Sequence, residues 1–356
     1  MKKSILLYSL FSVICSLTLT VNGQTNAAAD LLKTFTDRIE IHGYAQGGYD
    51  YNTTTNENSF NFKRTVVWAK AKITDKWSFL FMHDFNSKPL EYYTDFRPCK
   101  AIGFRMGQFK NSLTLENPMS PSKVELIDIC SQGVTYLTGC GSDPLFGRHT
   151  GRDLGLLIYG EPFKGFTYEL GIMNGQGINN RDLNKSKDLI AKLSYKLCDP
   201  LTVVATGQIG HGHTIADSEV NPYVHEGDNY RRHRYSVGAN YATAPFSLRG
   251  EYLKGWDGPV QSQGFYATST VNIIPKLDAV ASYDWFDRNT RSDFAQTNYT
   301  LGLQYWFFNK CRIQAQWTFC DPDSRWKKNY NMLQFQTQIC FCCKLTVESQ
   351  ESQSCK

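Results

Sequence analysis

The chain has 356 residues, of which 14% are aromatic and 27 are glycine, and its mean hydropathy is −0.40. Its formal net charge of +5 falls by two when Lys2 and Lys3 are removed, so charge alone predicts no nucleic-acid partner. Beyond the first two dozen residues, no apolar run approaches the ~18 residues of a membrane-spanning helix. If the chain spans a membrane, it does so as a closed barrel, because lipid satisfies no exposed backbone groups.

The amino terminus has the features of a secretory signal peptide. Lys2 and Lys3 precede an apolar stretch over residues 4–21, and Val21, Asn22 and Gly23 supply small residues before a cut near Gln24. An uncleaved membrane anchor is the alternative. We expect residues 1–23 to be removed on export and residues 24–37 to form a periplasmic leader.

Alternation of apolar and polar side chains begins at residue 38, where Ile39, Ile41 and Gly43 alternate with Glu40 and His42. A period of two is typical of a strand whose faces meet different environments. Segments of about ten residues suit tilted membrane strands. In chain order the predicted strands cover residues 38–50, 60–73, 77–85, 90–97, 101–110, 152–160, 166–175, 188–197, 201–210, 230–241, 246–256, 261–273, 275–286, 298–308, 312–319 and 333–341.

The pattern is clearest in the last three strands. Tyr299, Leu301 and Leu303 share one face, whereas Thr300 and Gln304 share the other, and aromatic residues cluster at the ends of the apolar face. A half-buried strand of a soluble β-sandwich also alternates. A membrane barrel alternates between lipid and a wet lumen, with aromatic girdles at both interfaces.

Connection lengths decide between these alternatives. Connections after strands 1, 5, 7, 9, 13 and 15 are long and polar, whereas those after even-numbered strands have two to five residues. Outer-membrane barrels have short periplasmic turns and longer outer loops, but a sandwich has no reason to sort its connections in this way. The sequence therefore predicts an all-β fold, a sixteen-stranded antiparallel transmembrane barrel over residues 38–341. The connection over residues 111–150 is too long for an ordinary turn and is expected to be functional.

The eleven cysteines show no regular disulfide framework. Cys99, Cys198 and Cys311 fall at predicted tight turns. Cys130 and Cys140 could close a loop within the long connection, and the oxidation state of the remaining cysteines stays open.

Several segments resemble the phosphate-selective porin O and P family of Bacteroidota and proteobacteria, and together they cover essentially the whole mature chain. The resembling segments are residues 41–46 (IHGYAQ), 60–64 (FNFKR), 104–110 (FRMGQFK) with Glu116, 151–155 (GRDLG) and 302–305 (GLQY). The resemblance implies a homotrimer of sixteen-stranded channels in the outer membrane. It also implies that the third outer loop, here residues 111–150, folds inward and narrows the pore.

The chain departs from this family in two ways. Family barrels generally end on an aromatic residue, whereas a polar, cysteine-containing tail over residues 342–356 follows Phe341. The anion-binding ladder of the family also has no residue-by-residue match here, which leaves phosphate specificity open.

A sixteen-stranded barrel leaves an aqueous channel, so its chemistry is that of its inward side chains. Basic residues outnumber acidic ones on the predicted inner face, and we expect an anion preference. A charge at about 4 Å is worth only ~1 kcal/mol in water, which suits conduction. Arg64 and Arg105 are the strongest candidates because they lie on strands near the long connection and also in resembling segments. The predicted pore-lining residues are Arg64, Lys70, Lys72, Arg105, Lys110, Arg148, Arg152, Arg249 and Arg312.

Other chemistry has little support. His211 and His213 lack a nearby cysteine or carboxylate cluster that would complete a metal site. No spacing unites a catalytic triad, and no glycine loop suits a nucleotide, so we predict neither an enzyme nor a cofactor. The expected partners are small anions such as phosphate, outer-membrane lipid and two further copies of the chain. A channel for another solute, such as an acidic sugar or a peptide, and a non-transport adhesin or surface antigen remain alternatives.

Overall fold

The structure is a computed structural model that describes residues 38–127, 131–141, 145, 147, 149–323 and 328–344. The predicted signal peptide, the leader and most of the predicted tail lie outside these residues, as do Cys130 and Arg148. Ile41–Cys343 form one compact unit. No helix in the described part of the chain is long and apolar enough to cross a membrane.

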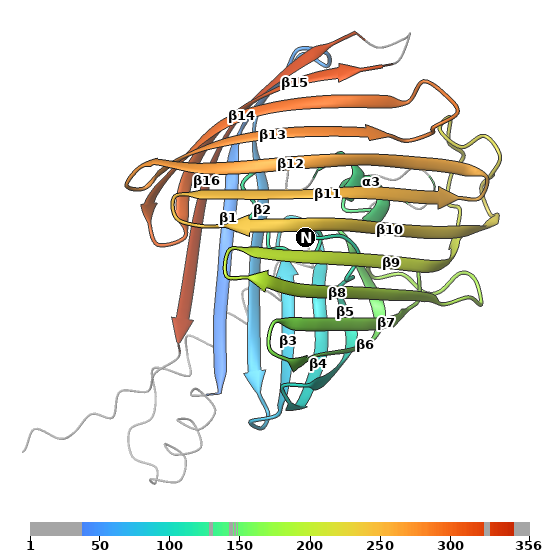
Figure 1. Cartoon of the computed structure of the whole chain (residues 1–356), viewed down its shortest axis with the longest axis vertical. Coiled ribbons are helices and arrows are strands. Elements are labelled where there is room, and N and C mark those ends of the chain that lie inside the picture. Colours follow the sequence, from blue (N-terminus) through green and yellow to red (C-terminus); the bar gives the residue numbers. More distant parts are fainter. Residues whose placement is uncertain are drawn as a thin grey trace, which may run out of the picture. The chain divides into compact units, whose positions relative to one another are not determined.

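Sixteen antiparallel strands of the described residues form a closed barrel, in which β1 pairs with both β2 and β16 (Figure 1). This confirms the predicted fold class. The elements are β1 (Ile39–Asn52), β2 (Glu57–Lys72), β3 (Trp77–Asp84), β4 (Pro89–Cys99), β5 (Ile102–Lys110), α3 (Gln132–Thr138), β6 (Arg152–Phe163), β7 (Phe166–Met173), β8 (Asp188–Cys198), β9 (Leu201–His213), β10 (Asn229–Ala242), β11 (Phe246–Asp257), β12 (Val260–Ile274), β13 (Leu277–Asp287), β14 (Ala295–Phe308), β15 (Cys311–Pro322) and β16 (Tyr330–Lys344).

Several strands are longer than the alternation predicts. β14 begins at Ala295 rather than at residue 298, and β16 runs from Tyr330 to Lys344, three residues beyond Phe341. Backbone pairing defines a strand, and pairing continues where side-chain alternation weakens near the membrane edge.

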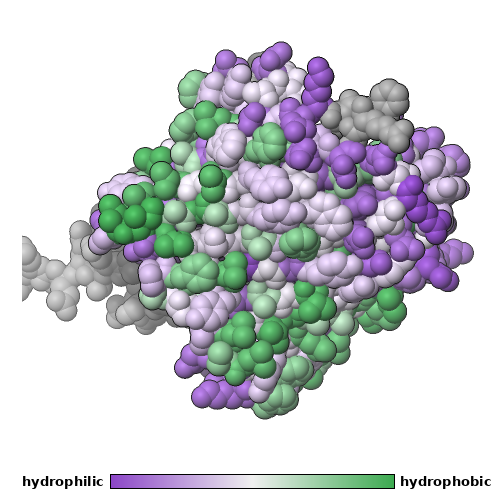
Figure 2. All heavy atoms as spheres, turned by 45° about the horizontal axis from the view of Figure 1, so that its top comes forward, coloured by the Kyte–Doolittle hydropathy of each residue, from purple (hydrophilic) through white to green (hydrophobic). Residues whose placement is uncertain are grey.

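The two faces of each strand meet different environments, as the alternation predicts. On β14, Leu301 and Leu303 are exposed on the outer wall, whereas Thr300 and Gln304 are buried on the inner wall. On the face in Figure 2, hydrophobic side chains form patches among residues of intermediate hydropathy, and hydrophilic side chains gather mostly toward the edges. An apolar outer wall around a polar interior is the arrangement that a bilayer requires of a barrel.

Aromatic rings on the outer wall form a chain of contacts across neighbouring strands. The ring centroids of Phe265 and Tyr283 lie 5.2 Å apart, those of Tyr283 and Tyr299 5.4 Å, and those of Tyr299 and Phe319 6.3 Å. Rings with a polar edge suit the level of the lipid headgroups, so this chain of contacts corresponds to the expected aromatic girdle.

The connections differ between the two ends of the barrel. Connections after even-numbered strands have two to four residues, whereas those after β5, β7 and β9 have fourteen or more. We assign the end with short turns to the periplasmic side and the end with long loops to the outer side.

Candidate pore constriction

The connection between β5 and β6, residues 111–151, folds into the barrel and is called the constriction loop below. Its backbone bonds to glutamine and arginine side chains of the opposite wall. Gln314 Nε2 donates to Glu125 O at 2.8 Å, and Arg312 Nη2 donates to Val124 O at 2.7 Å. Gln338 of β16 likewise donates to Ser122 O at 3.1 Å, so the polar inner faces of β15 and β16 pair backbone groups of the loop.

A helix within the loop packs on an apolar patch of the inner wall. Helix α3 contacts β11, β12 and β13, the strands in front of it in Figure 1. Val134 and Leu137 join Leu253 and Phe286 in one buried cluster, and the Tyr136 and Phe286 rings lie 5.4 Å apart. An apolar patch on the inner wall interrupts the polar pattern of the lumen, and burial beneath the helix explains it.

Arg249 on β11 holds two glutamates of the loop. Its Nη2 atom lies 2.9 Å from Glu116 Oε1 and 2.7 Å from Glu125 Oε2. Arg249 is 4% exposed and Glu116 is fully buried. Leu115 N, next to Glu116, donates to Glu251 on the same strand at 2.8 Å. A buried arginine between two carboxylates is a strong anchor, because removing it leaves uncompensated charges away from water.

A second contact ties the loop to the connection between β7 and β8. A Cβ atom at Gly177, whose φ is +76°, would lie 2.0 Å from His149 Nδ1, so only glycine permits this approach. Burial, with Arg232 and Lys88 nearby, lowers the pKa of His149 to about 3. His149 is therefore neutral at neutral pH and adds no charge to the loop.

The constriction loop leaves two cavities between itself and the barrel wall, one against β1–β6 and the other also reaching β14 and β16. The outer cavity measures about 320 Å³ and reaches the β3–β4 connection. The inner cavity measures about 920 Å³ and reaches the periplasmic turn after β14. Tyr44, Lys110, Pro121 and Arg152 line both cavities, so the two meet at these residues, which we call the waist. The waist is the candidate constriction of the channel.

Basic side chains dominate the walls of both cavities. Among the described residues that line them, seven are lysine or arginine and two are acidic. The basic residues are Lys63, Arg64, Lys88, Lys110, Lys123, Arg152 and Lys310, and the acidic residues are Asp84 and Glu91.

Some of the basic side chains that line the cavities are paired with carboxylates or with backbone carbonyl groups. Arg152 Nη2 lies 2.8 Å from Glu91 Oε1, and Lys63 Nζ lies 2.8 Å from Asp50 Oδ1. Lys110 Nζ bonds two carbonyl oxygens of the loop, Asn117 at 2.7 Å and Met119 at 2.6 Å. Even with Asp50 counted, basic side chains outnumber acidic ones along this path.

Lys63 and Arg64 are consecutive, yet both point into the lumen. Arg64 Nη1 donates to Gln46 Oε1 at 2.7 Å, and Lys63 pairs with Asp50. Gln46 and Asp50 lie on the same face of β1, and Asp50 also accepts a bond from Gln334 at 3.1 Å. Alternation is therefore broken in β2. Strict alternation placed Arg64 inward but turned Lys63 outward, which is why the sequence analysis missed Lys63.

The predicted pore-lining residues separate into three groups. Arg64, Lys110 and Arg152 line the cavities that meet at the waist. Lys70 shares a face with Leu80, a residue of the inner cavity, and Lys72 lies two positions further toward the periplasmic end. The remaining described ones, Arg105, Arg249 and Arg312, are engaged by other side chains or by the loop.

Arg105 faces the lumen and is enclosed by an acid and aromatic rings. Its Nη2 atom lies 2.8 Å from Asp95 Oδ2, and its guanidinium carbon lies 4.3 Å from the Tyr93 ring centroid and 5.4 Å from that of Tyr159. Tyr159 also bonds Asp95. An arginine held by a carboxylate and stacked rings has less charge available to a passing solute.

Sequence reasoning also missed Lys88, Lys123 and Lys310, which lie in connections. A turn or loop has no two-residue period that would show where its side chains point. In the part of the chain that the structure describes, no group of three or more His, Cys, Asp or Glu side chains could hold a metal ion.

A closed antiparallel barrel with an apolar outer wall, a polar interior and a loop folded into its lumen defines the class of outer-membrane channel barrels. Comparison of the sequence with models of known protein families identifies the family. Residues 120–321, or 202 of 356 residues, match the family model described as Gram-negative porin. The chain therefore belongs to the Gram-negative porin family, and this family and fold indicate the outer membrane.

Solved structures support the fold. The trimer form of OmpT, an outer membrane protein of Vibrio cholerae, is 13% identical, with a TM-score of 0.61 over 85% of this chain and 99% of that one. The outer membrane channel DcaP of Acinetobacter baumannii is 10% identical, with a TM-score of 0.59 over 85% and 97%. Salmonella typhi OmpF in complex with daunomycin is 12% identical, with a TM-score of 0.57 over 85% and 98%. No curated protein matches the chain in sequence.

Proposed function

We propose that this porin is a passive diffusion channel that favours small anions. The observation that carries the proposal is the excess of basic side chains along the path through the waist, where seven basic and two acidic residues of the described chain line the two cavities. A channel wall of one charge sign raises the local concentration of the opposite ion. Charges exposed to water attract a passing anion without trapping it.

The reversal potential of the purified protein in a planar bilayer, across a potassium chloride gradient, tests this proposal. We expect the anion-selective sign, because the waist excludes potassium more strongly than chloride. Repeating the measurement at 1 M salt, where the Debye length is about 3 Å, should reduce the selectivity. A cation-selective sign at low salt would overturn the proposal, and the absence of any channel current would favour the adhesin alternative.

The narrower proposal is that phosphate is the anion that the channel favours. The segments that resemble the phosphate-selective porin O and P family include Lys110 and Arg152, which line both cavities, and Arg64, which lines the outer one. Arginine pairs with phosphate through two parallel N–H donors. Addition of millimolar phosphate should then block part of the chloride current. An unaffected current would leave an anion channel without phosphate selectivity.

A second candidate solute class is favoured by the aromatic wall of the inner cavity. The His42 and Trp68 rings stack with centroids 5.3 Å apart, and Tyr44 meets Trp68 edge-on at 6.3 Å. Tyr93 and Lys123 of the constriction loop line the same cavity. Aromatic rings beside basic groups suit a solute that has both a ring and a negative charge.

We expect Trp68→Ala to weaken the interaction of the channel with ring-bearing anions. Benzoate should reduce the chloride current of the unaltered protein more than acetate does, because both carry one carboxylate but only benzoate can stack. A lost stacking contact of about 0.5–1.5 kcal/mol corresponds to a roughly two- to tenfold weaker block. Trp317→Ala, the same change on the outer wall, is the control. Equal block by benzoate and acetate in the unaltered protein would exclude this solute class.

We further propose that the chain is exported by its amino-terminal signal and forms a homotrimer. The V. cholerae structure named above is described as a trimer form, and the family resemblance implies the same state. Cross-linking in intact outer membranes should yield a band at three times the mass of the chain. A band at the mass of one chain alone would contradict the proposal.

A further inference from the structure

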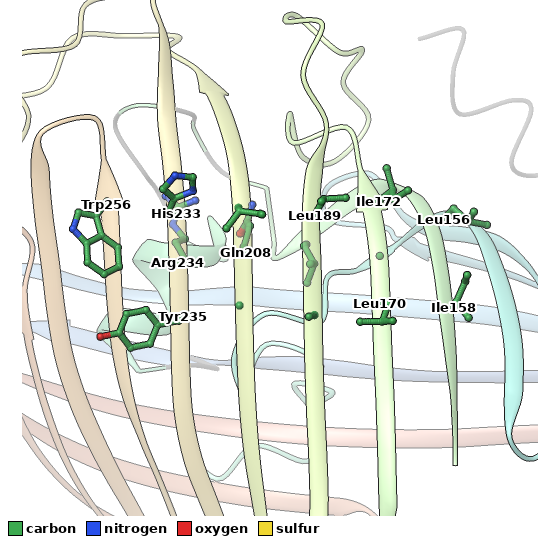
Figure 3. Close-up of a pocket in the computed structure, with 15 residues that line it drawn as sticks. Leu156, Ile158, Leu170, Ile172, Leu189, Gln208, His233, Arg234, Tyr235 and Trp256 are labelled. Carbon is green, nitrogen blue, oxygen red and sulfur yellow. The ribbon is translucent and has the colours of Figure 1, made fainter. Parts of the chain in front are cut away.

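The outer wall of the barrel carries a groove of about 600 Å³ over strands β6–β11. Figure 3 shows Tyr235 and Trp256 on one side and Leu156, Leu170 and Ile172 on the other. Between them the outward positions are Ala191 and Gly207, which pair with each other across β8 and β9. The groove lies on the lipid-facing surface and is separate from the channel.

Small side chains create this groove. A Cβ atom at Gly207 would meet only Arg234 O, at the ordinary contact distance of 3.8 Å. The backbone therefore does not require glycine here, and a larger outward side chain would fill the groove. The hollow is bordered by long apolar side chains on one side and by aromatic rings on the other, which suits a flexible hydrocarbon chain.

Basic side chains lie beside the groove toward the outer end of the barrel. Arg232 and Arg234 are buried on the inner wall, so Arg231 and His233 point outward. In the antiparallel pairing of β10 and β11, His233 is paired with Trp256 and Tyr235 is paired with Lys254. Lys254 lies three residues from the outer end of β11, and successive outward residues are about 7 Å apart along a strand.

These charges have few protein partners. Among the described residues, neither Arg231 nor Lys254 has an acidic partner within ion-pair distance, and the Lys254 ammonium lies 5.4 Å from the Trp256 ring centroid. Lys187, which immediately precedes β8, is already paired with Asp182. An outward-facing cation near the membrane interface costs free energy unless it reaches water or an anionic headgroup.

We propose that the groove and these basic residues bind a phosphorylated lipid of the outer leaflet. An acyl chain lies over Gly207 between the aromatic and aliphatic walls, and a headgroup phosphate contacts Arg231 and Lys254. The basic residues lie toward the end with long loops, which we assigned to the outer side. The lipid therefore belongs to the outer leaflet. A lipid phosphate supplies an anion for these two cations, whereas the apolar outer wall of a second copy would enclose them without one, so a lipid is favoured over a second copy.

Native mass spectrometry of the full-length protein in mild detergent tests this site. The probes are bisphosphorylated lipid A and the same lipid after enzymatic removal of its phosphates. We expect the unaltered protein to retain the phosphorylated form at least about fivefold more, an effect of ~1 kcal/mol. The double variant Arg231→Gln, Lys254→Gln should lose this preference, and Gly207→Phe should reduce retention of both forms.

A second hollow on the outer wall supplies a matched control. It measures about 450 Å³, is lined by Ala281, Leu301 and Ala315, and has no basic residue in its lining. Ala281→Phe should therefore leave lipid retention unchanged. Equal retention of the two lipid forms by the unaltered protein would overturn the proposal, and so would equal losses from Gly207→Phe and Ala281→Phe. Heat-modifiable migration on a gel verifies that each variant is folded.

Discussion

Replacing Arg249 by methionine should raise the single-channel conductance about twofold. Arg249 neutralises Glu116 and Glu125 where the constriction loop meets β11. Its removal leaves the fully buried Glu116 and the half-buried Glu125 without this cation, and a buried ion pair that loses one partner costs about 3–5 kcal/mol. We expect the loop to leave this part of the wall and the current to become larger and noisier. Planar-bilayer recordings in 1 M potassium chloride measure the change.

A triple variant separates the loss of the anchor from the loss of the arginine. Arg249→Met combined with Glu116→Gln and Glu125→Gln removes the cation and both anions together. Replacement of a whole buried ion-pair cluster by neutral groups is often close to neutral for stability. The triple variant should therefore have a conductance nearer to that of the unaltered protein. If Arg249→Met alone leaves conductance and noise unchanged, the ion pairs do not hold the loop.

Arg64→Glu should shift the anion-to-cation permeability ratio by about three- to tenfold toward cations. Arg64 lines the outer cavity next to the waist, on the wall that faces Pro121 of the loop. The substitution changes the local charge by two units. At 4 Å in a water-like medium each unit is worth about 1 kcal/mol, and salt screening reduces the sum. Reversal potentials across a potassium chloride gradient give the ratio.

Lys70→Glu is the matched control for this charge reversal. Lys70 lies on the same face of β2 as Arg64 but is exposed, further toward the periplasmic end. The channel is wider and wetter where a side chain is exposed, so screening weakens the effect. We expect Lys70→Glu to shift the ratio less than half as much as Arg64→Glu on a logarithmic scale. Equal shifts would mean that the narrowest charged region does not lie at the waist.

The sequence alone does not distinguish an arginine that lines a cavity from one that holds the loop. Arg64 and Arg249 both occupy inward positions of strands, and the alternation is the same around each. The structure places Arg64 beside a cavity and Arg249 between two carboxylates beneath the loop. Arg312 likewise bonds the loop backbone and lies 5.1 Å from the Trp306 ring centroid. The availability of an inward charge depends on what the loop covers, and the loop has no periodicity from which its path could be read.

Residues far apart in sequence meet at the waist for the same reason. Tyr44 lies on β1, Arg152 on β6 and Pro121 in the loop, and only closure of the barrel and entry of the loop bring them together. Arg64 was nevertheless predicted from its inward position on a strand, and Lys110 and Arg152 were predicted because they flank the long connection. Lys63 was missed because the irregularity in β2 reverses the direction of its side chain.

The sequence by itself determined the barrel, its strand number and the direction of most side chains. Those features depend on local alternation, which lipid outside and water inside impose on every strand, and on connection lengths that differ between the two ends. Only the tertiary structure decided which basic residues line the two cavities and which hold the loop. That outcome depends on contacts such as Glu116 with Arg249, which are separated by 133 residues and form only when the loop enters the lumen.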